Sequence, residues 1–327
     1  MRWCWRALSA ASVAAVLLVA LAMLLFTPGP AIASQSEAIW HPSPKDPAAL
    51  THMYDVNQRA MQAAGAPFAK WTGHGRQFLA FDPHGNGRVV EVFGNLGTAD
   101  RIAVLVPGVS TTADNFSTGL DDVRDRAPAV QARAVYDATR AAAPGQHVAV
   151  IAWLGYDAPQ GVGRTAAREE LARAGATALD AFTRDLATMR PSARVTVIGH
   201  SYGSVVAGLA AADLPSQVKD LVVVGSPGMG VSRAADLHTS AHIWAGQSAQ
   251  DWIDWVPAFQ VWGAGHGTLP VTPGFGATVF GTNGVTDHDQ YLASGTQSLG
   301  NIVSIVLGLD SSVTGPNSVS LPVQASG

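Results

Sequence analysis

The chain has 327 residues, of which 47% are hydrophobic and 13% charged. This composition is typical of a folded protein with a sizeable core and argues against a disordered chain. The formal net charge is −4 and the sequence contains no basic block, so we do not expect nucleic acid as a partner.

Residues 1–33 are predicted to form a secretory signal peptide. Arg2 and Arg6 precede an uncharged apolar run over 7–26, and Ala31-Ile32-Ala33 is typical of a cleavage site. The run is long for a signal peptide, so an uncleaved membrane anchor is the alternative. We therefore expect a secreted or cell-envelope protein that contacts a membrane only if this segment is retained.

The single cysteine, Cys4, lies before the apolar run. Cleavage after residue 33 would leave a chain without any cysteine. Such an exported protein would have no disulfide bond and would depend on its hydrophobic core for stability.

The segment that follows is predicted to lead from a linker into the folded domain. Residues 34–50 are rich in Ser, Pro and Ala and predict a linker, and His52 to Ala64 has the spacing of a helix. Two strands, 77–81 and 88–93, flank a connection that contains Asn86-Gly87, a signal for a β-hairpin.

From residue 101 onward, strands and helices alternate. Strands are predicted at 101–106, 147–154, 195–198, 218–224 and 240–245. Helices are predicted at 114–143, with an interruption near Pro128 as an alternative, and at 163–189, 202–213 and 290–309. This alternation predicts an α/β fold with a mostly parallel sheet and helices on both faces. In such a sheet the ligand site lies beyond the carboxyl ends of the strands. We see no repeat or second domain and assign residues 51–310 to one domain, followed by a flexible tail over 311–327.

Residues 256–286 interrupt the alternation with many glycines and prolines. A loop this long predicts either a cap over the site or an irregular surface excursion. Four aromatic residues lie near it: Trp252, Trp255, Phe259 and Trp262. They fit an apolar acyl or lipid site, or equally the core of the cap.

The sequence Gly199-His200-Ser201-Tyr202-Gly203 matches G-x-S-x-G. It follows a short β-branched strand and precedes a helix of small residues, which is the context that raises a nucleophilic serine above an α/β-hydrolase sheet. The flanking glycines suit this tight turn, because side chains there would clash with the neighbouring strand and helix.

A serine nucleophile needs a base, and in this fold the histidine follows the serine and precedes the last helix. His288 has that position. His238 and His242 are spaced i, i+4, but no carboxylate-rich pattern surrounds them, so structural roles are favoured over a metal site. His266 lies in the glycine-rich loop and is a candidate to line the site.

The acid must be an aspartate, because no glutamate follows Ser201. Four aspartates are less suited by their positions: Asp213, Asp220, Asp236 and Asp287. Asp251 and Asp254 remain, just beyond the strand predicted at 240–245. We favour Asp251 and keep Asp254 as the alternative acid.

The oxyanion hole in this fold combines two backbone N–H groups. Tyr202, directly after the nucleophile, supplies the first. Val109, in the loop after the strand 101–106, is our choice for the second, with Gly108 next. Pro107 replaces the histidine that commonly precedes this glycine, but the contact uses backbone and does not depend on that side chain.

Several motifs are shared with one family: Phe81-Asp82-Pro83, Val106-Pro107-Gly108, Trp153-Leu154-Gly155-Tyr156-Asp157-Ala158-Pro159, Gly199 to Ser204, Gly225-Ser226-Pro227-Gly228, and His288 with Tyr291. Through them the chain resembles, over residues 75–310, a bacterial α/β-hydrolase family that is largely defined as a domain of unknown function. The resemblance implies the fold and a serine-hydrolase triad but no substrate.

The sequence therefore predicts a secreted serine hydrolase that cleaves carboxylic esters, including lipid or acyl esters, with the triad Ser201, Asp251 and His288. No sequence pattern indicates a metal, nucleotide or flavin cofactor. One alternative is an acyltransferase with the same triad, which an added alcohol acceptor would reveal. Another is a non-catalytic envelope-binding protein on a hydrolase scaffold, which the presence of all three triad residue types disfavours.

Overall fold

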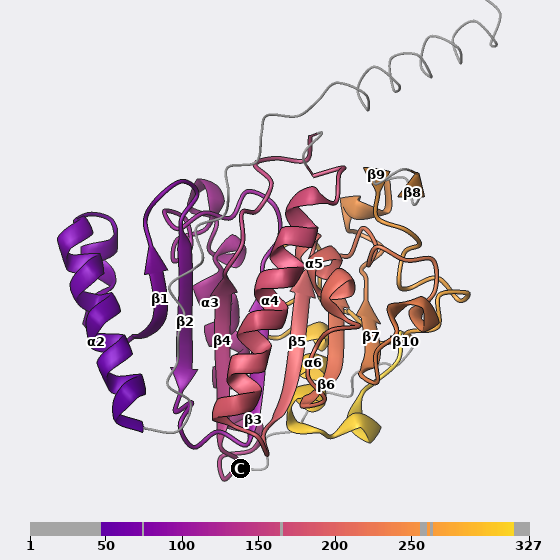
Figure 1. Ribbon diagram of the computed structural model, residues 1–327. Coiled ribbons are helices and arrows are strands. Elements are labelled where there is room, and N and C mark those ends of the chain that lie inside the picture. The colour runs from indigo at the N-terminus through magenta and orange to yellow at the C-terminus, as the bar shows by residue number, and fades with distance from the viewer. Residues whose placement is uncertain (1–46, 74, 164–165, 256–259, 262–263, 317–327) are drawn as a thin grey trace, which may run out of the picture.

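The protein is built around one eight-stranded sheet (Figure 1). The structure, a computed structural model, describes residues 47–73, 75–163, 166–255, 260–261 and 264–316. The strand order is β1-β2-β4-β3-β5-β6-β7-β10, with β2 antiparallel to both of its neighbours and the pairs from β4 to β10 parallel. This confirms the predicted α/β class and the mostly parallel sheet.

The strands contain β-branched and other apolar residues because helices cover the sheet. Their bounds are β1 Gln77–Asp82, β2 Arg88–Gly94, β3 Arg101–Val106, β4 Val148–Leu154, β5 Arg194–His200, β6 Val218–Val224, β7 His242–Gly246 and β10 Thr278–Val279. Every residue of β4 is buried, as expected for a strand in the middle of a covered sheet. A second, two-stranded sheet pairs β8 (Gln260–Val261) with β9 (Ala264–Gly265).

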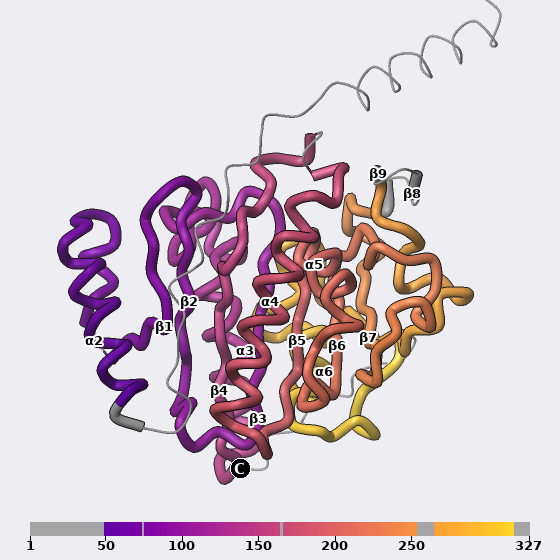
Figure 2. Tube along the Cα trace, in the orientation of Figure 1, coloured from indigo at the N-terminus to yellow at the C-terminus, as the bar shows by residue number. Residues whose placement is uncertain are grey.

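Helices cover both faces of the sheet, as predicted. One hydrophobic cluster joins α4 (Glu170–Met189) and α5 (Tyr202–Ala210) to one face. The other cluster joins α3 (Pro128–Ala142) and α6 (Gln297–Leu307) to the opposite face. The trace in Figure 2 runs from indigo α2 at one edge of the sheet to orange β7 near the other.

The N-terminal part of the domain differs from the prediction at the linker. Helix α2 spans Pro47–Ala64, so the last four residues of the predicted linker, 47–50, belong to a helix. Proline is favoured in the first turn of a helix, where its missing N–H has no partner to lose. Residues 1–46, including the predicted signal peptide, lie outside the described residues.

Three helices begin later than predicted. Residues 114–127 form turns and short 3-10 segments, and α3 begins only at Pro128, whose fixed φ suits a helix start. Helix α4 begins at Glu170 rather than at 163, and α6 at Gln297 rather than at 290. The Thr296 side chain caps α6 by accepting the Leu299 N–H.

The described part of the glycine-rich segment 256–286 packs at the edge of the sheet. It contributes β10, and Phe275 and Phe280 are buried in the two hydrophobic clusters. The start of the predicted flexible tail is also docked, because the Thr314 N–H donates to the Asn301 Oδ1 atom at 2.8 Å. None of the described helices is long and apolar enough to cross a membrane.

Candidate active site

Ser201 sits on the sharp turn between β5 and α5. Its backbone has φ 53° and ψ −126°, a conformation that is strained for any residue with a side chain. The Ser201 N–H donates to the Val224 carbonyl oxygen at 3.0 Å, which ties the turn to the neighbouring strand β6. The sequence motif thus folds as the strand–turn–helix that it predicts.

The glycines at this turn are required by close backbone contacts. A Cβ atom at Gly203 would lie 2.1 Å from the Val106 carbonyl oxygen, and one at Gly199 would lie 2.7 Å from the Ser204 Cα atom. Neither position has room for a side chain. Helix α5 therefore packs directly against the end of β3, and this brings the loop after β3 beside the serine.

His288 and Asp251 form a buried pair. The Nδ1 atom of His288 lies 2.8 Å and 2.9 Å from the two carboxylate oxygens of Asp251. A carboxylate accepts, so Nδ1 carries the proton and Nε2 of a neutral ring is the acceptor. That Nε2 atom is buried and forms no hydrogen bond within the described residues. The ring is thus oriented with its basic nitrogen unoccupied.

The Asp251 carboxylate is held by three donors. Besides His288, it accepts the Tyr291 hydroxyl at 2.7 Å and the Ile253 N–H at 2.9 Å. Burial by itself would raise the pKa of Asp251, but the hydrogen bonds from His288, Tyr291 and Ile253 and the electrostatic attraction of the His288 ring outweigh it and lower the pKa below its usual value. The Tyr291 oxygen in turn accepts the Ser248 N–H at 3.0 Å. The acid therefore stays ionised inside the protein.

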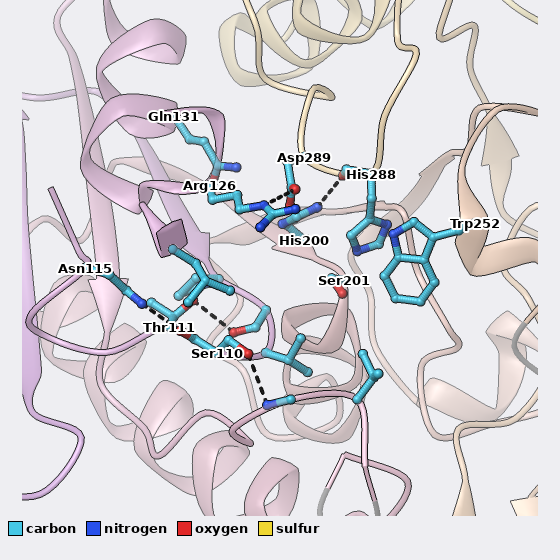
Figure 3. A pocket seen from close by; sticks show the side chains of 16 residues that line it. Ser110, Thr111, Asn115, Arg126, Gln131, His200, Ser201, Trp252, His288 and Asp289 are labelled. Atoms are coloured by element: carbon cyan, nitrogen blue, oxygen red, sulfur yellow. Dashed lines mark hydrogen bonds and ion pairs between the residues drawn. The ribbon is translucent and has the colours of Figure 1, made fainter. Parts of the chain in front are cut away.

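His200, the residue before the serine, contacts the other side of His288. Its Nε2 atom lies 2.8 Å from the main-chain oxygen of His288, and the two rings are 5.0 Å apart (Figure 3). Burial first, and then repulsion from His288, lower the pKa of His200 to about 4. His200 is thus neutral at pH 7, with its proton on Nε2.

The loop after β3 lies against the serine. A Cβ atom at Gly108 would be 2.7 Å from the Ser201 Cβ atom. The loop is fixed by the Tyr156 hydroxyl, which donates to the Pro107 carbonyl at 2.7 Å, and by Asn115, whose Nδ2 atom donates to the Ser110 carbonyl at 2.8 Å. Such a braced loop holds its backbone N–H groups in place without the need for ligand-induced ordering.

Both predicted oxyanion donors lie at this junction. Val109 follows Gly108 and lines the pocket, and its N–H forms no hydrogen bond among the described residues. Tyr202 is the first residue of α5, where a backbone N–H has no acceptor within its helix. The Tyr202 hydroxyl donates to the Arg168 carbonyl at 2.8 Å, which anchors the start of the helix.

A pocket of about 250 Å³ opens onto Ser201, His200 and His288 (Figure 3). Polar side chains, among them Asn115 and Gln131, form one part of its lining, and Leu120, Val162 and Trp252 form an apolar part. The Trp252 ring lies 4.7 Å from the His288 ring. Figure 3 shows Ser201 on the side of the pocket where His288 and Trp252 lie.

An ion pair forms another part of the pocket lining. The Nε atom of Arg126 donates to the Asp289 carboxylate at 2.7 Å, and both residues line the pocket. This hydrogen bond, opposed by some burial, raises the pKa of Arg126 above its usual value. Because the two charges offset each other, the pair gives the pocket polarity without a net charge.

The remaining predicted residues lie elsewhere. The His242 Nε2 atom lies 2.7 Å from the Thr278 hydroxyl, and its ring lies 4.3 Å from that of Trp244, whereas His238 follows a short 3-10 helix with φ 50°. The Nε2 atom of His266 lies 2.7 Å from the Ala166 carbonyl oxygen. Within the described residues, no group of three or more metal-ligating side chains includes these histidines.

The predicted cap and its aromatic residues lie partly outside the described residues. No described residue of 256–286 lines the pocket, whose lining includes the loops after β3 and β4, the serine turn, Trp252 and the loop before α6. The described part of that segment fits the alternative, an irregular surface excursion, because β10 pairs it with β7 at the sheet edge. Phe259 and Trp262, and the side chains of Asp254 and Trp255, lie outside the described residues.

Three residues at the site, Tyr291, His200 and Arg126, had no role predicted from the sequence. Tyr291 was part of a motif, but nothing in the sequence showed that its hydroxyl reaches Asp251. His200 belonged to the serine motif without a separate role. Arg126 lies in a segment predicted as helix, and its ion pair joins residues 163 positions apart. Contacts over such separations leave no signal in one sequence.

These features match a known family. The sequence profile described as α/β hydrolase matches residues 82–261, more than half of the chain, and the chain belongs to that family. Membership supports hydrolase activity and confirms the predicted fold and the family resemblance.

The relatives have no described activity. The chain is 31% identical over 261 residues to an uncharacterized protein of Mycobacterium tuberculosis, with 70% of this chain and 39% of the relative covered. It is 36% identical over 147 residues to an uncharacterized protein of Mycobacterium bovis, with 44% of this chain and 53% of the relative covered. The chain thus aligns with well under two thirds of each of these relatives.

Among solved structures, a serine hydrolase without a lid from Xanthomonas campestris is similar, with a TM-score of 0.40, 14% identity, and coverage of 76% of this chain and 98% of that one. The esterase domain of a Rhodothermus marinus protein has a TM-score of 0.39, 13% identity, and coverage of 72% and 96% respectively.

Proposed function

We propose that the protein is a serine hydrolase that cleaves carboxylic esters through an acyl-enzyme. The observation that carries this proposal is the buried pair of His288 and Asp251, which leaves the Nε2 atom of His288 unoccupied in the pocket that Ser201 lines. A serine hydroxyl is a weak nucleophile by itself, and an oriented imidazole is the group that activates it.

In the first half of the reaction, the Ser201 Oγ atom attacks the ester carbonyl while the Nε2 atom of His288 takes its proton. The ionised Asp251 stabilises the resulting imidazolium. The N–H groups of Val109 and Tyr202 stabilise the negative charge on the carbonyl oxygen. His288 then gives its proton to the leaving alcohol, and the acyl group remains on Ser201.

In the second half, water replaces the alcohol. It gives a proton to His288 and attacks the acyl carbon, and His288 returns a proton to Ser201 as the acid leaves. The neutral state of His200 supports both halves, since a second cation 5.0 Å away would oppose protonation of His288. We further propose that the enzyme acts outside the cytoplasm or in the cell envelope, on the basis of residues 1–33.

A fluorophosphonate probe tests the proposal, because it reacts with activated serines. We expect a covalent adduct on Ser201, located by mass spectrometry, that is lost in Ser201→Ala. The adduct should also nearly vanish in His288→Ala but persist in His242→Ala, a histidine far along the chain that bonds Thr278. A folded protein that remains unlabelled, or a label that does not depend on His288, would contradict the proposal.

A further inference from the structure

Exposed apolar side chains gather at the mouth of the pocket. Within the described part of the chain, six large hydrophobic side chains are exposed: Val56, Leu120, Val123, Val162, Trp252 and Leu309. Three of these, Leu120, Val162 and Trp252, line the pocket, and Val123 lies three residues beyond Leu120. We call these four residues the apolar rim. Exposed apolar side chains that gather around a pocket mark an interaction site rather than ordinary surface.

The loop that displays Leu120 and Val123 has an unfavourable backbone. Asp121 and Asp122, on the C-terminal side of Leu120, have positive φ at 56° and 58°, and Gly119 before Leu120 has φ 86°. The loop is closed by the Val123 N–H, which donates to the Leu120 carbonyl at 3.1 Å. A strained backbone beside a reactive pocket suggests that the side chains it displays have a function.

The charges beside the rim indicate what kind of surface it fits. The segment 121–126 contains three acidic and two basic residues: Asp121, Asp122, Asp125, Arg124 and Arg126. Arg126 is already paired with Asp289. Attraction to an anionic membrane needs a surplus of Lys and Arg, which this segment lacks. The rim itself is apolar, and the segment 121–126 beside it has one more acidic than basic residue. This combination fits a lipid surface without net charge.

The small volume of the pocket also favours a lipid surface as the partner of the rim. Its volume of about 250 Å³ is below the roughly 300–1,000 Å³ of sites that enclose a drug-sized ligand. A long acyl chain would need apolar surface beyond the pocket, and the rim provides it at the mouth. The rim is therefore placed to contact both the substrate chain and the surface from which the chain comes.

We propose that the apolar rim docks the protein on an uncharged lipid surface and that a long-chain ester enters the pocket directly from it. This inference rests on the proposed esterase function for its second part, since it names the substrate class of that site. The docking itself requires no catalysis and can be measured on an inactive protein.

The docking test uses the full chain with Cys4→Ser and Ser201→Ala. Because Cys4 is the only cysteine, one new cysteine can carry an environment-sensitive fluorophore. Val123→Cys places it on the rim and Val56→Cys away from it, at valines that are 42% and 43% exposed. The probe is a vesicle of phosphatidylcholine and triolein with nitroxide-labelled acyl chains. The N-terminal apolar segment is the same in both proteins.

We expect the nitroxide to quench the fluorophore at position 123 at least about threefold more than that at position 56, because only the rim reaches the acyl chains. Equal quenching at the two positions would overturn the docking proposal. So would a response at position 123 that depends on protein concentration without vesicles, since the rim would then join two copies of the chain.

A kinetic test addresses the substrate class with Ser201 intact. Val123→Asp should lower the ratio of emulsified long-chain ester hydrolysis to soluble short-chain ester hydrolysis about tenfold, since a charge on the rim opposes docking. Val56→Asp should leave that ratio unchanged. Equal ratios in the two variants would overturn the inference, while Ser201 labelling by the fluorophosphonate would still support the esterase. Loss of Ser201 labelling would instead contradict the proposed function and leave the quenching result intact.

Discussion

The Nε2 atom of His200 donates a hydrogen bond of 2.8 Å to the main-chain oxygen of His288. His200 belongs to the serine turn and His288 to the loop before α6, so one contact joins the two segments that carry the proposed nucleophile and the proposed base. Because the contact uses the His288 backbone, it fixes the position of the ring without occupying either ring nitrogen.

His200→Phe should keep the ring packing but remove the donor. We expect kcat for a soluble ester to fall about tenfold, because a small misplacement of the base weakens proton transfer. His200→Gln, which retains an N–H donor, should recover part of the loss. Steady-state kinetics on the three proteins provide the measurement. Equal activity of wild type and His200→Phe would show that this hydrogen bond does not position the base.

The low pKa of His200 predicts a pH-dependent stability. Burial and repulsion from His288 lower this pKa to about 4, whereas a histidine in an unfolded chain has a pKa of about 6.5. Between these pH values the unfolded chain binds a proton that the native residue does not. The free energy of unfolding therefore falls as the pH decreases from 6.5 to 4, by roughly 3 kcal/mol in total.

Urea unfolding of wild type and His200→Phe at pH 7, 6, 5 and 4.5 isolates this contribution. The variant lacks the titrating group, so the stability advantage of the wild type should narrow as the pH falls. An advantage that stays constant over this range would contradict the assignment of a low pKa to His200.

Asp251→Asn should lower kcat by roughly 10⁴, because an amide can donate to Nδ1 and stabilise the wrong tautomer of His288. Asp254→Asn makes the same chemical change three residues away and serves as the matched control. We expect it to change kcat less than about threefold, since Asp251 already bonds both the base and Tyr291. The reverse order of effects, measured by ester hydrolysis, would assign the acid to Asp254.

Tyr291→Phe removes one donor from the Asp251 carboxylate and leaves the Ser248 N–H without its acceptor. Loss of a donor should raise the pKa of Asp251 towards its usual value. We expect a stability loss of about 1–3 kcal/mol, measured by urea unfolding. Tyr136→Phe should cost much less, because the Tyr136 hydroxyl accepts a long, exposed hydrogen bond of 3.4 Å from Arg140. Equal losses would show that the buried hydroxyl does not stabilise the acid.

Gly108→Ala places a methyl group 2.7 Å from the Ser201 Cβ atom and 3.1 Å from its Oγ atom. We expect the fluorophosphonate labelling rate to fall at least about tenfold, because the nucleophile and the oxyanion loop must move apart. Gly145→Ala, where the new methyl would meet no atom within 4 Å, is the control and should label normally. Normal labelling of Gly108→Ala would mean that the loop can shift without loss of function.

Much of the fold was predictable because its signals are local. The bounds of β3 and β6 agree with the sequence prediction, since each is an apolar run between turn residues. Helix starts were less predictable. Residues 290–296 were included in the predicted helix, but the Thr296 side chain caps α6, which therefore begins at Gln297.

The sequence by itself determined the serine turn and its place after a strand, because the glycines and the nucleophile are contiguous and the backbone conformation depends on them. Only the tertiary structure decided which aspartate contacts His288, because the two residues are 37 positions apart in the chain. Asp251 lies in the loop after β7 and His288 in the loop before α6, and the fold brings these two loops together. The same holds for the contacts of His200, Tyr291 and the apolar rim, whose proximity is set by packing and not by spacing along the chain.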